Sequence, residues 1–443
     1  MSFIYFMVSK CVYIKAGSKL LNINKKQHLL ISDQDFIDHI TVTSMEYKFK
    51  HLVFDIHPKN PPEWNRPLCV IDQGIACNDD YLFKYNRYRK HSAENKSEEL
   101  VNETLIRYNF IADRWEKIKC KNLPTYFKLT SILLSGNLII IHGGKDFEYI
   151  NKYTFQIFIG NLTKKNQYDC VEFEEICSTN GIPITEYGQP VLIDGQFVYF
   201  LNGTSEYQNE MDVYRLDLCS KKWQLLCQAR GQYPKTDESL RREVAYYDNH
   251  LYMFGGAHVM ILLKNMFLDT FEEIQVFDIS TNKWDYFKTL PDLQNSSSSY
   301  PANRCYYGWA QCATQPEYVY MSGGSDNFNF FSDIWRLNLI TLQWCNLMPC
   351  KLPKSMFLHS STIVPSGRIY YYNGIVSTEA IDMYQKDDIL CAWVRIPKLK
   401  AMCWDAMLYY FKNKMLKSSL EDLKNMGLPL EYYESIIKAK TLI

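Results

Sequence analysis

The stretch from Leu251 to Trp284, LYMFGGAHVMILLKNMFLDTFEEIQVFDISTNKW, decides the fold of this chain. Its first four residues are apolar and predict a buried strand, and Gly255-Gly256 then permits a tight turn or close backbone packing. Residues 274–284, IQVFDISTNKW, predict a second strand, a turn and a third strand that Trp284 opens. With the preceding REVAYYDNH, which supplies another strand, the segment reads as one four-stranded antiparallel unit.

This unit recurs along the chain. Glycines that end the strand of the LYMFGG type stand 59, 53, 68 and 50 residues apart, at Gly144, Gly203, Gly256, Gly324 and Gly374. Four strand–turn–tryptophan segments have the same seven-residue offset, and they end at Trp115, Trp223, Trp284 and Trp344.

A four-stranded unit repeated about every 50 residues is typical of a kelch β-propeller. An ordinary β-sandwich with chance diglycines is the alternative, and five anchors in phase argue against it. We therefore predict an all-β, six-bladed propeller over residues 81–394, with the four tryptophans packed between adjacent blades.

Several blades depart from the pattern. Tyr81 to Asn86 is a degraded first copy, and residues 126–178 form a second blade without its tryptophan. Arg87 to Glu103 is charged and polar, which predicts an exposed loop. The sixth blade begins near Phe357, with Trp393 as a candidate closing tryptophan. The alternating run MEYKFKHLVFDI, residues 45–56, predicts a strand that completes a blade.

Charge and cysteine content narrow the function. Lys and Arg number 49, as do Asp and Glu, so the chain has no overall attraction to nucleic acid or membranes. The apolar run Phe3 to Val8 is too short for a signal core or a membrane span. The 14 cysteines form no CxxC pair and no zinc spacing, which favours reduced thiols in the cytoplasm or nucleus and predicts no metal.

The pattern changes at Pro397 from strands to helical spacing. Ser418 or Ser419 can cap a second helix that Gly427 ends. We expect three parts: an N-terminal segment and linker over 1–67, the propeller over 68–396 and a helical segment over 397–443. The first helix carries an apolar face, which consists of Leu399, Met402, Cys403, Ala406, Met407 and Tyr410. A helix pair that merely packs on the propeller is the alternative to a docking helix that enters a partner's groove.

Leu-x-x-x-Cys followed by an apolar residue resembles the BC box, which binds elongin C. Three segments extend this likeness: SDIWRLNLITLQW (332–344), IPKLKAMCW (396–404) and Leu-x-x-Leu-x-x-x-Gly-Leu (420–428). On these segments the chain resembles the Kelch domain-containing protein 10 family, whose members are substrate receptors of cullin-2 RING ubiquitin ligases. It departs from the family where YN replaces the first diglycine, where NG replaces two others, and at Lys398 within the box.

The resemblance implies a non-catalytic ubiquitin-ligase adaptor without a cofactor. Its implied partners are elongin B and elongin C, cullin-2, and substrate proteins whose C-terminal degrons end in glycine. The elongin-binding residues it implies are Leu399, Met402, Cys403 and Met407, and the cullin-binding residues are Leu420, Leu423, Leu428 and Pro429.

A substrate's C-terminal carboxylate needs a cationic fork and hydrogen-bond donors, which arginine supplies bidentately. A tight pocket that excludes a β-carbon would select a terminal glycine. In kelch repeats the residues just before the inner strand face the pocket, which gives as candidates Arg241, Arg304, Arg242, Tyr187 and Ser325. The alternative is that these arginines pair with carboxylates at blade edges, such as Glu243.

Two other function classes compete with the adaptor. A kelch scaffold could bind actin or a signalling protein, with the C-terminal helices merely structural. A propeller enzyme of the copper-radical kind would need convergent Tyr, His and Cys side chains. The four candidate histidines fall at separate blade positions, which disfavours this class: His142, His250, His258 and His359.

Overall fold

The fold was analysed in a computed structural model of residues 1–443. The residues that the structure describes are 15–16, 19–20, 50–52, 74–90, 100–124, 130–143, 157–176, 190–193, 195–201, 212–228, 238–240, 243–260, 265–294, 299–326, 328–372, 374–377, 383–385, 389–395 and 397–442. The chain divides into two compact units, one of residues 48–402 and one of residues 1–47 with 403–443.

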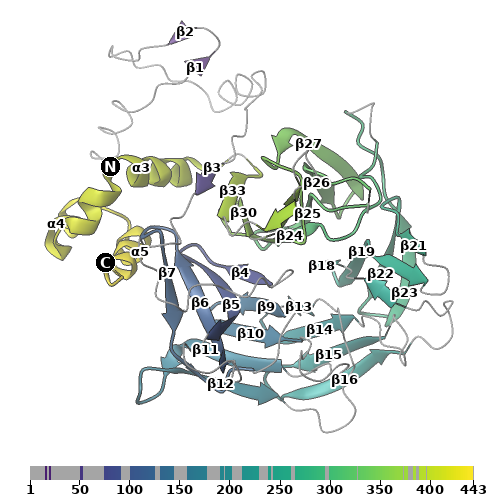
Figure 1. The fold of residues 1–443 in the computed structure, drawn as a ribbon, viewed down its shortest axis with the longest axis horizontal. Helices are drawn as coiled ribbons and strands as arrows, with labels where there is room; N and C mark the ends of the chain where they lie inside the picture. The colour runs from purple at the N-terminus through teal and green to yellow at the C-terminus, as the bar shows by residue number, and fades with distance from the viewer. Residues whose placement is uncertain are drawn as a thin grey trace. The chain divides into compact units, whose positions relative to one another are not determined.

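Six sheets follow one another along the first unit and form a six-bladed β-propeller, as predicted (Figure 1). Blade 1 is β4 (Ile75–Cys77), β5 (Tyr81–Lys90), β6 (Leu100–Asn109) and β7 (Arg114–Ile118); blade 2 is β9 (Ser131–Ser135), β10 (Leu138–His142), β11 (Ile157–Lys165) and β12 (Val171–Ile176); blade 3 is β13 (Pro190–Ile193), β14 (Phe197–Leu201), β15 (Val213–Asp217) and β16 (Lys222–Cys227). Blade 4 is β18 (Glu243–Tyr247), β19 (His250–Phe254), β22 (Glu273–Asp278) and β23 (Lys283–Lys288); blade 5 is β24 (Gly308–Cys312), β25 (Gln315–Ser322), β26 (Asp333–Asn338) and β27 (Gln343–Lys351); blade 6 is β29 (Ser360–Ile363), β30 (Arg368–Tyr372), β33 (Ile389–Trp393) and β3 (Lys50–Leu52).

Short strands supplement the blades. One of them adds in parallel to the outer edge of blade 2, and two groups of three form small sheets next to blades 4 and 6. These strands are β8 (Cys120–Lys121) on blade 2, β17 (Glu238–Leu240), β20 (Ala257–Met260) and β21 (Asn265–Leu268) in one small sheet, β28 (Met356–Phe357), β31 (Ile375–Ser377) and β32 (Met383–Gln385) in the other, and the separate pair β1 (Lys15–Ala16) and β2 (Lys19–Leu20).

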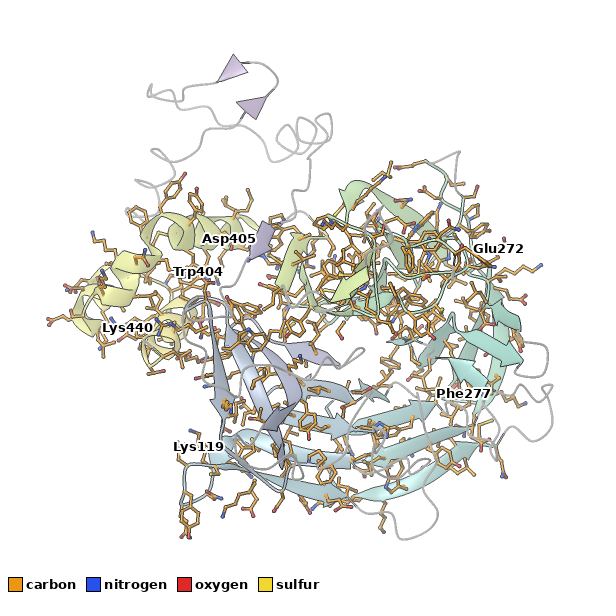
Figure 2. The ribbon with its side chains drawn as sticks, viewed as in Figure 1. Lys119, Glu272, Phe277, Trp404, Asp405 and Lys440 are labelled. Carbon is orange, nitrogen blue, oxygen red and sulfur yellow. The ribbon has the colours of Figure 1, made fainter. Side chains whose placement is uncertain are left out.

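The tryptophan of the repeat lies directly opposite the residue seven positions before it. In blade 4, Phe277 on β22 is the cross-strand partner of Trp284 on β23, and Phe277 is labelled in Figure 2. Each of the four tryptophans packs in a cluster shared with the neighbouring blade, and these clusters confirm the predicted position between blades. Trp344 also donates a hydrogen bond from Nε1 to the carbonyl of Phe271 in blade 4, at 3.1 Å.

Blade 2 replaces the tryptophan pair with a phenylalanine and a glycine. Gly160 on β11 pairs with Phe173 on β12, at the position where blade 4 has Phe277 and Trp284. A β-carbon on Gly160 would come within 2.8 Å of the Phe173 ring, so the glycine makes room for that ring. The missing tryptophan of this blade is therefore compensated by a smaller aromatic side chain that packs between blades 1 and 2.

The N-terminal segment completes blade 6. Lys50 to Leu52 pairs antiparallel with β33 and forms the fourth strand of the blade, as predicted for a strand in residues 45–56. The prediction that Trp393 closes the blade is wrong. Trp393 lies on the third strand, where it pairs with Arg368 and receives its guanidinium 4.4 Å from the ring centroid.

Within the predicted loop over residues 87–103, residues 87–90 and 100–103 are instead paired strands. β5 continues to Lys90 and β6 begins at Leu100, with Arg87 opposite Glu103. No diglycine interrupts this second strand, so the chain continues in strand conformation where other blades turn.

The diglycines accommodate a side chain from the next blade. Gly255 has φ of 57°, and a β-carbon there would collide with the hydroxyl of Tyr307, which donates to the carbonyl of Phe254 at 3.0 Å. At Gly323, with φ of 58°, a β-carbon would instead collide with the carbonyl oxygen of Met356, which precedes blade 6, and would lie 3.0 Å from the ring of His359. Tyr307 and His359 each directly precede an inner strand, so the repeat links successive blades at this point.

His142 at the end of β10 makes the stability of the propeller depend on pH. Complete burial lowers the pKa of this imidazole from 6.5 to about 3. Between pH 6.5 and about pH 3 the imidazole is therefore protonated in the unfolded chain but neutral in the folded one. The free energy of unfolding falls as the pH drops through this window. At pH 5 the expected loss is about 2 kcal/mol relative to pH 7.

His142→Leu, which copies the equivalent Leu201 of blade 3, should reduce this slope in denaturant titrations at pH 7 and pH 5. An unchanged difference between the two pH values would show that His142 is not its source.

The C-terminal unit contains helices α3 (Leu399–Lys417), α4 (Leu420–Asn425) and α5 (Leu430–Lys440). Ser419 caps α4 in a reciprocal capping box with Asp422, and Gly427, with φ of 67°, follows the helix, both as predicted. The third helix, α5, was not predicted. None of the helices in the described part of the chain is long and apolar enough to cross a membrane.

A small apolar core holds the three helices together. Met415, Leu423 and Ile436, one from each helix, are its fully buried members. Trp404 on α3, labelled in Figure 2, stacks on Tyr432 of α5 with ring centroids 4.2 Å apart.

Candidate functional site

The two small sheets lie at the end of the blades where the inner strand begins and the second strand ends, whereas β8 lies at the opposite end of blade 2. In blade 5, for example, Gly308 at the start of β24 pairs with Ser322 at the end of β25. The small sheets next to blades 4 and 6 arise from this same end, as does the loop that follows β25. We define this side, built from the segments before the inner strands and after the second strands, as the loop face.

Arg304 lies on the loop face but is 1% exposed. Its guanidinium forms a bidentate ion pair with Asp333, with Nη2 to Oδ2 at 3.0 Å, and donates to the carbonyls of Gly323 and Ala302 at 3.1 and 2.9 Å. It also stacks on the ring of Phe331, 3.7 Å from the centroid. The arginine fork is thus engaged by blade 5 itself, which corresponds to the structural alternative considered for these arginines.

Ser325 is buried beside Arg304's own segment. Its backbone exchanges two hydrogen bonds of 2.9 Å with Cys305, and the thiol of Cys305 also reaches the Ser325 carbonyl. This bridge ties the segment before the inner strand of blade 5 to the loop after its second strand. Ser325 therefore lies beside the segment that contains Arg304 and Cys305.

The other three predicted degron-binding residues, Tyr187, Arg241 and Arg242, lie outside the described residues. The neighbouring Glu243 is described: it begins β18 and is buried.

Helix α3 presents the predicted elongin-binding residues in two different settings. Leu399 and Met402 are 69% and 48% exposed, and Cys403 is half-buried with a free thiol. Met407 instead packs against the apolar core of the three helices. The first turns of α3 therefore expose two large apolar side chains that the protein itself does not bury.

Two tyrosines extend this exposed face and were only partly foreseen. Tyr409 and Tyr410 are highly exposed, with ring centroids 4.9 Å apart. Tyr410 shares the predicted apolar face, whereas Tyr409 lies beside it at helical spacing from Met402. We call Leu399, Met402, Tyr409 and Tyr410 the exposed stripe of α3.

The predicted cullin-binding residues also differ in exposure: two belong to the helical core and two are exposed. Leu423 is completely buried in the core of the three helices, and Leu428 packs against that core. Leu420 at the start of α4 and Pro429 at the start of α5 are exposed. Only the latter two present their side chains to a partner without opening the helical unit.

The described residues offer no cluster of three or more His, Cys, Asp or Glu side chains that could hold a metal ion. His359 shares a hydrogen bond of 2.9 Å with Ser322, but both are buried and packed against the backbone of Gly308. This pair joins blades 5 and 6 and has no opening toward solvent, so it supports the fold.

Comparison with known proteins places these features in context. Residues 167–374 match the model of the KLHDC2/KLHL20/DRC7 Kelch-repeats domain. The chain is 27% identical over 392 residues to the Kelch domain-containing protein 10 homolog of Drosophila melanogaster, a match that covers 84% of this chain and 62% of that protein. It is 26% identical over 386 residues to Kelch domain-containing protein 10 of Xenopus laevis, covering 85% and 86%, and 25% identical over 374 residues to the Homo sapiens protein, covering 83% and 78%.

Proposed function

Because the chain is a kelch-propeller protein of the Kelch domain-containing protein 10 family, we propose that it is the substrate-recognition subunit of a cullin-2 RING ubiquitin ligase. In this role α3 binds elongin C, which is paired with elongin B, and the propeller binds the C-terminal ends of substrate proteins. The adaptor itself performs no chemistry. It holds a substrate lysine near a ubiquitin-charged enzyme, and proximity is its contribution.

One observation carries the proposal: α3 begins with a Leu-x-x-x-Cys segment in which Leu399 and Met402 are exposed and Cys403 is half-buried, on a helix that is buried further along by α4 and α5. Leu399 is 69% exposed, whereas Met415 on the same helix is fully buried against α4 and α5. A helix with large apolar side chains on its exposed face suits insertion into a partner's groove. Co-expression with elongin B and elongin C tests this directly, and the decisive variants are described in the Discussion.

Because Leu423 is buried in the helical core, the proposed cullin-2 contact is made by the two exposed residues, Leu420 and Pro429. Removing the whole segment 420–428 would expose the helical core, because Leu423 belongs to it. Single substitutions at the two exposed positions therefore test cullin-2 binding more cleanly than a deletion.

For the substrate, we propose that the terminal carboxylate is bound on the loop face, with Arg241 as its principal cation. Arg304 and Asp333 then shape the blade 5 side of the pocket, because their hydrogen bonds fix the segment that contains Ser325. Arg242 and Tyr187 complete the candidate set. A terminal glycine fits a pocket whose walls leave no space for a β-carbon.

Arg241→Ala should weaken binding of a glycine-ended peptide by about 1.5–3 kcal/mol, the range for a hydrogen bond to a charged group. Amidation of the peptide terminus should weaken it comparably, and amidation should add little in the variant because both changes remove the same interaction. Isothermal titration with the four combinations measures this coupling. Additive effects would place the carboxylate at another cation, and no effect of either change would favour a scaffold without C-terminal recognition.

A further inference from the structure

The loop after β25 holds one large apolar side chain almost fully in water. Phe328 is 90% exposed, the most exposed of the large hydrophobic side chains that the structure describes. Soluble proteins bury such rings in general, and an exposed aromatic side chain on a binding face is a candidate contact for a partner.

The loop that carries Phe328 is fixed by its own hydrogen bonds. Ser325 bridges to Cys305 on one side and to Phe330 on the other. The carboxylate of Asp326 accepts hydrogen bonds from the backbone of Phe328 and Asn329, at 2.9 and 2.5 Å, and from the Asn329 side chain at 2.8 Å. Burial alone would raise the pKa of Asp326, but these hydrogen bonds hold it below its usual value, so the carboxylate stays charged and keeps accepting them.

Other aromatic rings adjoin this loop. Phe330 stacks on Phe357 of β28, in the small sheet next to blade 6, with ring centroids 5.0 Å apart, and both are half-buried. Phe331 receives the guanidinium of Arg304. The loop face between blades 5 and 6 therefore combines an exposed ring, carried on a hydrogen-bonded backbone, with a half-buried ring pair. Because the loop backbone is already hydrogen-bonded, it should lose little conformational entropy when a ligand covers Phe328.

We propose that Phe328, next to the Phe330–Phe357 pair, binds an apolar side chain at the third or fourth residue from the C-terminus of the substrate. This inference rests on the proposed function, in which Ser325 belongs to the blade 5 side of the pocket that binds the carboxylate. Phe328 is three positions after Ser325 in the chain, a reach of at most about 10 Å, and an extended peptide covers about 3.3 Å per residue. The ring therefore meets the peptide upstream of the terminal glycine, and it selects among substrates that share this glycine.

Two peptides test the inference. Both end in the same glycine, and one carries leucine and the other serine at the third and fourth positions from the end. We expect the wild-type full chain to bind the leucine peptide about tenfold more tightly, as a well-placed hydrophobic contact allows. Phe328→Ser should bring the ratio close to one while binding still weakens on amidation of the terminus.

Tyr168→Ser is the matched control, because Tyr168 is an exposed aromatic residue at the β11–β12 turn of blade 2. It should keep the wild-type ratio. A ratio that Phe328→Ser leaves unchanged, with binding still dependent on the free carboxylate, overturns this inference alone. Absence of any binding by the wild-type chain overturns the proposed function as well.

Discussion

Asp333→Ala is expected to destabilise the propeller by about 3 kcal/mol, the low end of the range for breaking a buried ion pair. Asp333 is the carboxylate partner of Arg304, whose side chain is 1% exposed, and the substitution leaves that guanidinium buried without a counter-charge. The same carboxylate accepts a hydrogen bond of 2.7 Å from Trp335 Nε1, which is lost too. The low end applies because the Asp333 side chain is 23% exposed and water reaches it.

Equilibrium denaturation of the wild type and the variant measures this effect. Arg304→Met combined with Asp333→Leu should cost less than Asp333→Ala, because removing both partners leaves no isolated charge. Lys165→Ala is the control, since its ion pair with Asp169 is exposed on both sides, and no measurable change is expected. A double variant less stable than Asp333→Ala would show that packing around the pair matters more than its charge.

The same variant reports on the pocket. If Arg304 only supports blade 5, Asp333→Ala should weaken peptide binding in proportion to the loss of folded protein. If instead Arg304 can bind a carboxylate once Asp333 is gone, the variant will bind glycine-ended peptides more tightly at equal folded fraction. The second result would return Arg304 to the set of direct ligands.

The repeat in the sequence was enough to predict the propeller, because its strands meet their neighbours at fixed offsets. The seven-residue interval from Phe277 to Trp284 corresponds to a direct cross-strand pair in the structure. Blade 2 conceals the same pairing, since its partners Gly160 and Phe173 are 13 positions apart across a bulged, longer hairpin. A fixed offset cannot reveal a pair when the turn length changes.

The candidate site could be predicted less completely than the fold, because it depends on contacts between segments that are distant in the sequence. Arg304 was predicted from its place before an inner strand, but its partner Asp333 comes 29 residues later and no local pattern joins them. Similarly, the spacing of Leu423 on α4 predicts an apolar face, and only the unforeseen helix α5 shows that this face is internal. Burial depends on which elements meet, and periodicity alone does not give that.

Leu399→Ala with Cys403→Ser is expected to abolish elongin C binding. Truncating a leucine that is buried in a groove costs about 2–5 kcal/mol, and a few central residues dominate helix-in-groove interfaces. The free protein should be unaffected, because Leu399 is 69% exposed and its truncation opens no cavity. Co-purification with elongin B and elongin C, together with a thermal melt of the free variant, measures both consequences.

Leu293→Ala is the matched control, since Leu293 is an 80% exposed leucine in the loop after blade 4, and it should retain elongin binding. Met415→Ala tests the helical core instead: Met415 is 1% exposed between the three helices, so its truncation should destabilise that unit as well as weaken docking. Comparing the two variants distinguishes loss of the elongin contact from unfolding of the helical unit. If the Leu399/Cys403 variant unfolds the chain or still co-purifies with elongin, the exposed stripe of α3 serves another purpose and the scaffold hypothesis becomes the stronger one.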